Sequence, residues 1–288
     1  MSEYTIKNDI LTVKADSFGA RLTSVYAFDT QYLWQKDPAW WDDQAPVLFP
    51  FVGRLFEGAY TMDGDGYTMP IHGIAPYEEF AVADRGADFI TFVLTANERT
   101  MAVYPRQFAF FVTYRLEGAC VQVCFQVENR DQKPMYFAVG GHPGFNVPLE
   151  EGFCFEDYRL EFETPCIPGS VQQSDSCLMT GRVLEYPLKN GCILPLDRHL
   201  FDRDSLILCN CARTVTLTCG SKRWVKLSFP QMDYLLLWQA KNAPYVCIEP
   251  WSSLPSNQDE HTVFEEKKDL ITLKPTDIYI NNWSITVG

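Results

Sequence analysis

The chain has 288 residues, of which 47% are hydrophobic and 14% aromatic, so it can bury a sizeable core and is not a disordered segment. Its 37 acidic and 24 basic residues give a formal net charge of −13, which argues against a nucleic-acid partner, since phosphate backbones are bound by clustered Lys and Arg. No run of about 18 apolar residues is present, so we expect no membrane span.

The start of the chain and its cysteines bear on where the protein works. Residues 1–6 show no basic region followed by an apolar stretch, so we expect no signal peptide and a cytoplasmic protein. In that setting the ten cysteines are expected to be reduced and mostly buried. Cys209 and Cys211 form the one close pair, without the further cysteines or histidines of a zinc site. We therefore expect no bound metal.

The expected elements at the start of the chain are one short helix and a hairpin. Asp37 as a cap and Pro38 at the first helical position predict a short helix that reaches Trp41. Residues 63–66, Asp-Gly-Asp-Gly, predict a hairpin turn rather than a calcium loop, because the glutamate that closes an EF-hand is missing.

The middle of the chain has the character of strands. Residues 89–94 and 108–114 are nearly all apolar, whereas apolar and polar residues alternate over 121–128, as in a strand with one buried face. A further strand is expected at 135–139. Many strands and few helical signals predict an all-β protein, a large antiparallel β-sandwich with few short helices. Because no repeat or linker divides the chain, we expect residues 1–288 to form a single domain.

Two of the four histidines stand in constrained settings. His72 follows a strand-like run and precedes Gly73, which lets another group approach the backbone, although a lone histidine near a strand end is more often structural than catalytic. His142 lies among glycines and a proline directly after an expected strand, in a stiff turn that aims its side chain away from the sheet. We therefore favour a functional role for His142. His199 and His261, in polar and charged stretches, are expected to face solvent.

An ionisable carboxyl group ends an apolar, strand-like run near the C-terminus, residues 246–251. Pro250 and Trp251 are expected to stop the strand, which leaves Glu249 on a rigid element and partly shielded from water. Such shielding raises the pKa of a carboxyl group toward the range that a general base needs. Together with the two constrained histidines, Glu249 indicates acid–base chemistry.

Three further residues are candidates for contacting a ligand. Arg54 ends an otherwise uncharged run, so it is expected to be partly buried and to hold either a core carboxylate or a ligand hydroxyl. Trp238 ends the apolar run 234–238, where a wall for a ligand ring and plain core packing are equally plausible. Asp204 could accept ligand hydroxyls or serve as a turn or cap residue.

These residues belong to segments that resemble the aldose 1-epimerase (galactose mutarotase-like) family, and more closely its LacX-type branch. Four segments occur in family order: Pro46–Leu55, His72–Ala75, Gly141–Phe145 and Ile248–Trp251. Residues 196–208, which contain Asp204, are similar to a fifth family segment. The chain departs from the pattern in two places. Pro76 stands where the family usually has an arginine, and residues 252–256 replace a glycine and a short acidic turn.

The resemblance implies a β-supersandwich that binds an aldohexose and interconverts its α and β anomers without a cofactor. By that analogy Glu249 is the base that removes the proton of the C1 hydroxyl, and His142 is the acid that protonates the ring oxygen. The other candidates would contact the sugar: Arg54, His72, Asp204 and Trp238. The implied partner is the sugar alone, with no nucleic acid or membrane, and the protein is expected to be a monomer or homodimer.

Two alternative functions are open from the sequence. One is an epimerase of phosphorylated hexoses, which needs a basic cluster at the pocket rim. Pro76 in place of an arginine speaks against it. The other is a non-catalytic sugar-binding or sensing protein on the same scaffold, suggested by the altered residues 252–256.

Overall fold

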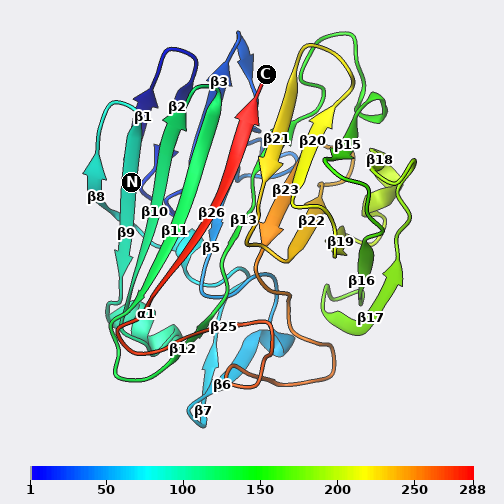
Figure 1. The fold of residues 1–288 in the computed structure, drawn as a ribbon. Helices are drawn as coiled ribbons and strands as arrows, with labels where there is room; N and C mark the ends of the chain where they lie inside the picture. Colours follow the sequence, from blue (N-terminus) through cyan, green and yellow to red (C-terminus); the bar gives the residue numbers. More distant parts are fainter. Residues whose placement is uncertain (1) are drawn as a thin grey trace.

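The structure of the chain is a computed structural model that describes residues 2–288. Strands account for nearly all of its regular structure, as the sequence predicts, and two large antiparallel sheets dominate it (Figure 1). The first is a nine-stranded sheet. Its strands, in spatial order, are β18 (Ile193–Pro195), β15 (Arg159–Phe162), β20 (Thr214–Thr218), β21 (Trp224–Ser228), β26 (Ile278–Val287), β11 (Cys120–Asn129), β10 (Phe108–Glu117), β9 (Phe89–Thr95) and β8 (Ala81–Arg85).

The second large sheet, of eight strands, lies against the first and carries Trp238 and Glu249, with His142 between two of its short strands. Its path runs through β17 (Met179–Glu185), β16 (Gly169–Gln173), β19 (Ser205–Cys209), β22 (Tyr234–Trp238), β23 (Tyr245–Trp251), β13 (Gly140–Gly141) and β5 (Val47–Leu48). A further short strand, β14 (Gly144–Asn146), also pairs with β23, so β13 and β14 share that neighbour.

Smaller elements complete the fold. A four-stranded sheet contains β1 (Glu3–Lys7), β2 (Thr12–Asp16), β3 (Leu22–Ala27) and β4 (Thr30–Gln31). The remaining strands are β24 (Thr262–Val263), β6 (Ala59–Met62) and β7 (Asp65–Thr68) in one sheet, and β12 (Met135–Phe137) with β25 (Ile271–Leu273) in another. The helices are α1 (Glu98–Val103) and the 3-10 turns η1 (Phe56–Gly58), η2 (Ala75–Tyr77), η3 (Phe155–Asp157) and η4 (Arg198–Phe201).

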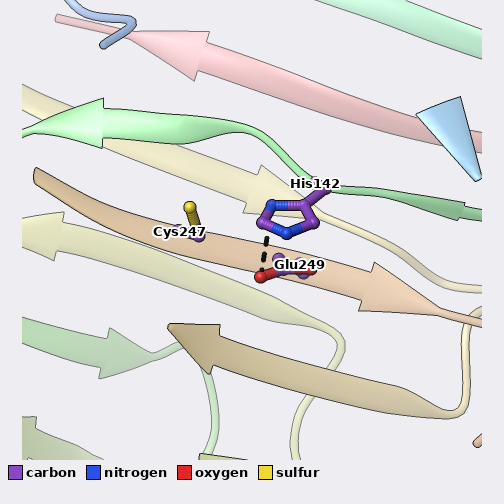
Figure 2. Close-up of side chains that lie close together, drawn as sticks. All are labelled: His142, Cys247 and Glu249. Carbon is purple, nitrogen blue, oxygen red and sulfur yellow. Dashed lines mark ion pairs between the residues drawn. The ribbon is translucent and has the colours of Figure 1, made fainter. Parts of the chain in front are cut away.

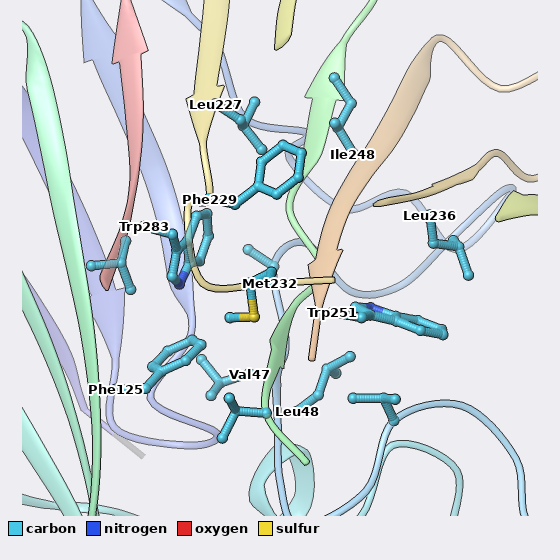
Figure 3. Close-up of a cluster of buried hydrophobic side chains, with 14 of the residues drawn as sticks. Val47, Leu48, Phe125, Leu227, Phe229, Met232, Leu236, Ile248, Trp251 and Trp283 are labelled. Carbon is cyan, nitrogen blue, oxygen red and sulfur yellow. The ribbon is translucent and has the colours of Figure 1, made fainter. Parts of the chain in front are cut away.

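The alternation of side chains explains why these segments form strands. In β11 every second residue is buried and the residues between are only partly so, which is the pattern of a strand with one face on a core. Between the two large sheets, Phe125 of β11 and Trp283 of β26 belong to the same buried cluster as Leu48 of β5 and Ile248 of β23 (Figure 3). The inner faces of the two sheets therefore form the core.

Several expected elements are confirmed. Strands β9, β10 and β11 cover the predicted ranges 89–94, 108–114 and 121–128. The turn at Asp63 and Gly64 joins β6 to β7 as the predicted hairpin. The expected strand at 135–139 is shorter, because β12 ends at Phe137 and the chain then passes into β13 of the eight-stranded sheet.

The expected helix from Asp37 to Trp41 is wrong. The amides of Trp40 and Trp41 donate to the Asp37 carbonyl at 2.9 and 2.8 Å, but this single turn is not continued. The Trp41 carbonyl accepts instead from the Asp37 amide at 3.2 Å and from the Trp34 indole at 3.0 Å. The segment closes on itself between Asp37 and Trp41, so the turn does not continue as a helix.

The expected end of the strand at Glu249 is also wrong, because β23 runs through Pro250 to Trp251. Backbone amides alternate in direction along a strand. The Ile248 amide donates to the Pro143 carbonyl at 3.1 Å, so the Pro250 nitrogen faces the same neighbour. That neighbour is interrupted there, between β13 and β14, and a proline without an N–H costs no ladder bond at this gap.

The cysteines are all free, but most are not buried as expected. Six are partly buried and Cys154 is exposed, which leaves Cys209, Cys211 and Cys247 as buried thiols. Alternation places Cys120 and Cys124 on the partly exposed face of β11, whereas the other four partly buried cysteines lie in turns and loops. No helix among residues 2–288 is long and apolar enough to span a membrane.

Candidate active site

A pocket of about 350 Å³ lies on the eight-stranded sheet, and all six residues that the sequence singled out line it. They are Arg54, His72, His142, Asp204, Trp238 and Glu249. Part of the wall is one cross-strand row in which Ile207 of β19 is opposite Leu236 of β22, which is opposite Glu249 of β23. Residues from six separate sequence segments therefore meet in one place.

Glu249 and His142 lie side by side at the inner end of this pocket. The His142 Nδ1 and the Glu249 Oε1 are 3.3 Å apart (Figure 2). Glu249 is fully buried and His142 is 8% exposed. Neither the His142 Nδ1 nor either Glu249 oxygen has a hydrogen-bond partner among the described residues. Buried polar atoms are normally satisfied, so these three atoms indicate a place for a polar ligand.

The turn that carries His142 is held by close packing of the glycines before it. A Cβ on Gly140 would come within 2.8 Å of the Trp251 ring, and one on Gly141 within 2.6 Å of the Trp283 ring. The His142 amide donates to the Pro46 carbonyl at 3.1 Å. The interruption between β13 and β14 thus lets the His142 side chain project over β23 toward Glu249.

Burial shifts the two ionisable groups in opposite directions. It raises the pKa of Glu249 well above its ordinary value, opposed by the Trp251 side chain and reinforced by Asp204. It lowers the pKa of His142 to about 4, and the nearby Asp43 carboxylate opposes this only in part. Burial thus favours the uncharged form of each group, a protonated carboxyl and a neutral imidazole.

His72 is fixed as a hydrogen-bond donor to the pocket. Its Nδ1 accepts from the Gly53 amide at 3.1 Å, and its own amide donates to the Gly53 carbonyl at 2.9 Å. Burial, then His142 and Arg54, lowers the pKa of His72 well below its ordinary value. A neutral imidazole that accepts at Nδ1 carries its proton on Nε2.

Gly73 explains the tight path of the chain after His72. Its φ is +81°, and a Cβ there would lie 2.3 Å from the Phe49 carbonyl oxygen. The close approach that the sequence suggested for this glycine is therefore made by backbone of the segment before Arg54.

The remaining three predicted residues lie toward the mouth of the pocket. Arg54 is exposed, so the expectation that it is partly buried is wrong: the uncharged run before it packs into the core, and the guanidinium extends outward. Asp204 is also exposed, and its Oδ1 accepts a hydrogen bond from the Trp238 indole at 3.3 Å. Trp238 is partly buried and packs against the core as well as lining the pocket.

The sequence reasoning missed several lining residues. The Trp41 ring stacks on the His142 ring at 4.9 Å and covers it. Asp43, two residues on, accepts from Arg21 at 2.6 Å. Gln173 of β16 donates to the Ser205 carbonyl at 2.6 Å, and Cys177 lies on the loop after β16. None of these stands in a distinctive local pattern, and only the folded chain brings them to the site.

His199 and His261 are exposed, as expected, and lie outside this pocket. His199 contacts Asp202 at 3.0 Å. The functional assignment of the histidines therefore narrows to His72 and His142, whose rings are 5.3 Å apart.

Comparison with known proteins identifies the group to which the chain belongs. The family model of aldose 1-epimerase matches residues 2–280. The chain belongs to the aldose 1-epimerase family. This membership makes the protein an isomerase of the epimerase type with a mutarotase-type function.

The relatives agree with this membership and with the LacX-type resemblance. The chromosomal protein LacX of Lactococcus lactis subsp. lactis is 35% identical over 295 residues, which cover 98% of each chain. A galactose mutarotase related enzyme of Lactobacillus acidophilus is 32% identical, with a TM-score of 0.94 over 100% of this chain and 97% of that one. A galactose mutarotase-like protein of Lactobacillus casei is 28% identical, with a TM-score of 0.94 over 100% of both chains. The fold is the galactose mutarotase-like supersandwich.

Proposed function

We propose that the protein interconverts the α and β anomers of a free aldohexose, with Glu249 and His142 as the proton-transfer pair. The carboxylate of Glu249 takes the proton from the O1 hydroxyl, and the imidazolium of His142 gives a proton to the ring oxygen. The C1–O5 bond breaks as the C1 carbonyl forms. Rotation about C1–C2 and the reverse proton transfers then close the ring on the other face.

The observation that carries this proposal is the contact between the two buried groups, 3.3 Å apart with their polar atoms unsatisfied. The reaction needs a base and an acid that together hold one proton, which is the state that the two opposite pKa shifts favour. In the free protein burial favours this proton on Glu249. Its transfer to His142 across the contact produces the carboxylate and imidazolium that the reaction uses.

The pocket wall supports a neutral sugar rather than a sugar phosphate. Among the described residues that line it, Arg54 is the one lysine or arginine, whereas Asp43, Asp204 and Glu249 are acidic. A phosphorylated hexose needs several cationic donors. The Nε2–H of His72 and the guanidinium of Arg54 would donate to sugar hydroxyls, Asp204 would accept from them, and Trp238 would form a wall.

The test is polarimetry or exchange NMR of α-glucose, α-galactose and a broader aldose panel. Wild type should accelerate anomer exchange, and Glu249→Gln and His142→Asn should each lower the catalysed rate roughly 10²–10⁴-fold, since each removes one proton-transfer group. Glu185→Gln and His199→Asn, on exposed residues outside the pocket, are the matched controls and should retain the rate.

A wild-type protein that accelerates exchange of no aldose contradicts the proposal. Calorimetry then decides whether the pocket still binds a hexose. Tight binding without faster exchange would support a non-catalytic sugar-binding protein, for which the loop 252–256 is the motivating difference. That loop includes Pro255, which lines the pocket.

A further inference from the structure

A third donor atom converges on the Glu249 and His142 pair. The Sγ of Cys247, the Nδ1 or Nε2 of His142 and a carboxylate oxygen of Glu249 all lie within 4.8 Å of one another. Cys247 and Glu249 are two residues apart on β23 and so project from the same face of the strand, and the His142 ring lies over this face next to Glu249 (Figure 2). The anomer exchange proposed above makes no use of this thiol.

The trio is enclosed and chemically unsatisfied. Cys247 and Glu249 are fully buried, and His142 is 8% exposed. The His142 Nδ1 and both Glu249 oxygens have no hydrogen-bond partner among the described residues. A sugar can satisfy the nitrogen and the oxygens through its hydroxyl groups. The thiol, a weak hydrogen-bonding group, gains little from a sugar.

One nitrogen, one sulfur and one oxygen donor form a ligand set that suits Zn²⁺. Zinc binds such donors at about 2.0–2.3 Å in tetrahedral geometry, which places them about 3.3–3.7 Å apart. Side-chain rotations that move the donor atoms by about 1 Å would bring the three atoms to those separations. Mg²⁺ and Ca²⁺ prefer oxygen ligands, so the thiol selects against them.

The charges around the trio are close to balance. Asp43 and Asp204 line the same pocket, but Asp43 is paired with Arg21 at 2.6 Å and Arg54 lies at the exposed mouth. The donor atoms of the trio itself, rather than a surrounding field, therefore select the ion.

We propose that Cys247, His142 and Glu249 bind Zn²⁺ and that the bound ion inhibits anomer exchange. Binding uses the lone pair of the imidazole, the carboxylate and the thiolate, and the protons of Glu249 and Cys247 pass to solvent. The ion then occupies both proton-transfer groups, and its fourth position faces the sugar pocket. The inhibitory part rests on the proposed function, whereas the binding part does not.

Cobalt is the spectroscopic probe for the binding part. After EDTA treatment, Co²⁺ added to wild type should give a near-ultraviolet thiolate-to-cobalt charge-transfer band together with the visible bands of tetrahedral cobalt. Cys247→Ala should lack the charge-transfer band, and Cys124→Ala, on the distant β11, should retain it. Glu249→Gln, which keeps the shape of the side chain, should lower cobalt affinity at least about tenfold.

A wild type without the charge-transfer band overturns the metal site. So does a Cys247→Ala variant that keeps the band, because the thiolate ligand would then be another cysteine, such as Cys209 or Cys211.

Anomer exchange tests the inhibitory part. Each variant is compared with its own EDTA-treated rate, so that basal differences cancel. Saturating Zn²⁺ should slow wild type at least about tenfold, since it removes an acid–base pair. Cys247→Ala should need at least about tenfold more Zn²⁺ for the same effect. An active wild type that zinc does not slow overturns inhibition. An EDTA-treated wild type with no activity contradicts the proposed function but not the metal site. The cobalt spectrum then tests the metal site independently.

Discussion

Glu249 is fully buried on β23, and neither of its carboxyl oxygens makes a hydrogen bond of ordinary geometry with the described residues. Its folded-state pKa lies well above that of the unfolded chain, chiefly because of burial. The corresponding stability is present below the unfolded pKa, near 4.5, and is lost as the pH rises toward the folded pKa. The burial that the proposed role of Glu249 uses therefore costs stability as the pH rises above the unfolded pKa.

Glu249→Gln should raise the melting temperature relative to wild type, and more so at pH 8 than at pH 5. The neutral amide removes the group that the unfolded state ionises more readily than the folded state does. Thermal denaturation at the two pH values measures this. The exposed Glu185→Gln variant controls for the change in net charge. An unchanged or lower melting temperature at pH 8 contradicts the assignment of Glu249 as a destabilising buried acid.

The catalysed rate should have a bell-shaped pH dependence. Below about pH 4 His142 binds the second proton of the pair, which leaves no base, and kcat/KM should fall. At high pH the pair loses its remaining proton from Glu249, and kcat/KM should fall again. Polarimetry with the buffer-catalysed rate subtracted measures the profile, and return of samples to pH 7 controls for unfolding. A profile that does not fall below about pH 4 excludes this pair as the proton-transfer groups.

At the scale of elements, one gap in the eight-stranded sheet and one turn beside that sheet build the site. The gap lies between β13 and β14, where the chain leaves the ladder at His142 and Pro250 faces the gap. The turn is at His72 and Gly73 and lies against the Phe49 carbonyl. Each of these irregular segments places one imidazole in the wall of the pocket.

Gly73→Ala should destabilise the protein by more than about 2 kcal/mol, because it combines a positive φ with a backbone clash. Gly118→Ala is the matched control. That glycine also has a positive φ, +59°, but a Cβ there would meet nothing within 4 Å, so the variant should cost about 1 kcal/mol. Urea denaturation of both variants measures the difference. Equal losses of unfolding free energy in the two variants would mean that the close approach to Phe49 is not the reason for a glycine at position 73.

At the scale of the whole molecule, the packing of the two large sheets holds the pocket rigid. Phe110 of β10 stacks on Phe49 at 4.6 Å and contacts Phe125 of β11 at 5.8 Å. Phe49 in turn leads directly into the segment that ends at Arg54. The core of the sandwich and the wall of the pocket are thus parts of one packed unit.

Phe110→Ala should lower the free energy of unfolding by about 3–5 kcal/mol, since it removes a fully buried aromatic ring. Val183→Ala, on the edge strand β17 with its side chain 55% exposed, should change it by less than about 0.5 kcal/mol. Urea denaturation measures both. A small loss for Phe110→Ala would show that the core between the sheets repacks easily.

The fold class and the six site residues could be predicted from the sequence because they depend on local signals. Period-two alternation predicts β11, and glycines and prolines around His142 and His72 predict stiff turns. The path of β23 through Pro250 could not be predicted, because it depends on a gap in a neighbouring strand more than 100 residues earlier. The exposure of Arg54 likewise depends on where the segment that ends at Arg54 leaves the core.

The sequence by itself determined the family and the chemical groups, because a run of ordered motifs specifies which residues are present. Only the tertiary structure decided the ionisation of these groups and which residues lie beside them. A carboxyl group and an imidazole 107 positions apart in the chain acquire opposite pKa shifts when burial removes water from both. The same packing places Trp41 and Cys247 beside this pair. No local sequence pattern predicts that they are close to it, because contacts across strands depend on register rather than on neighbours in sequence.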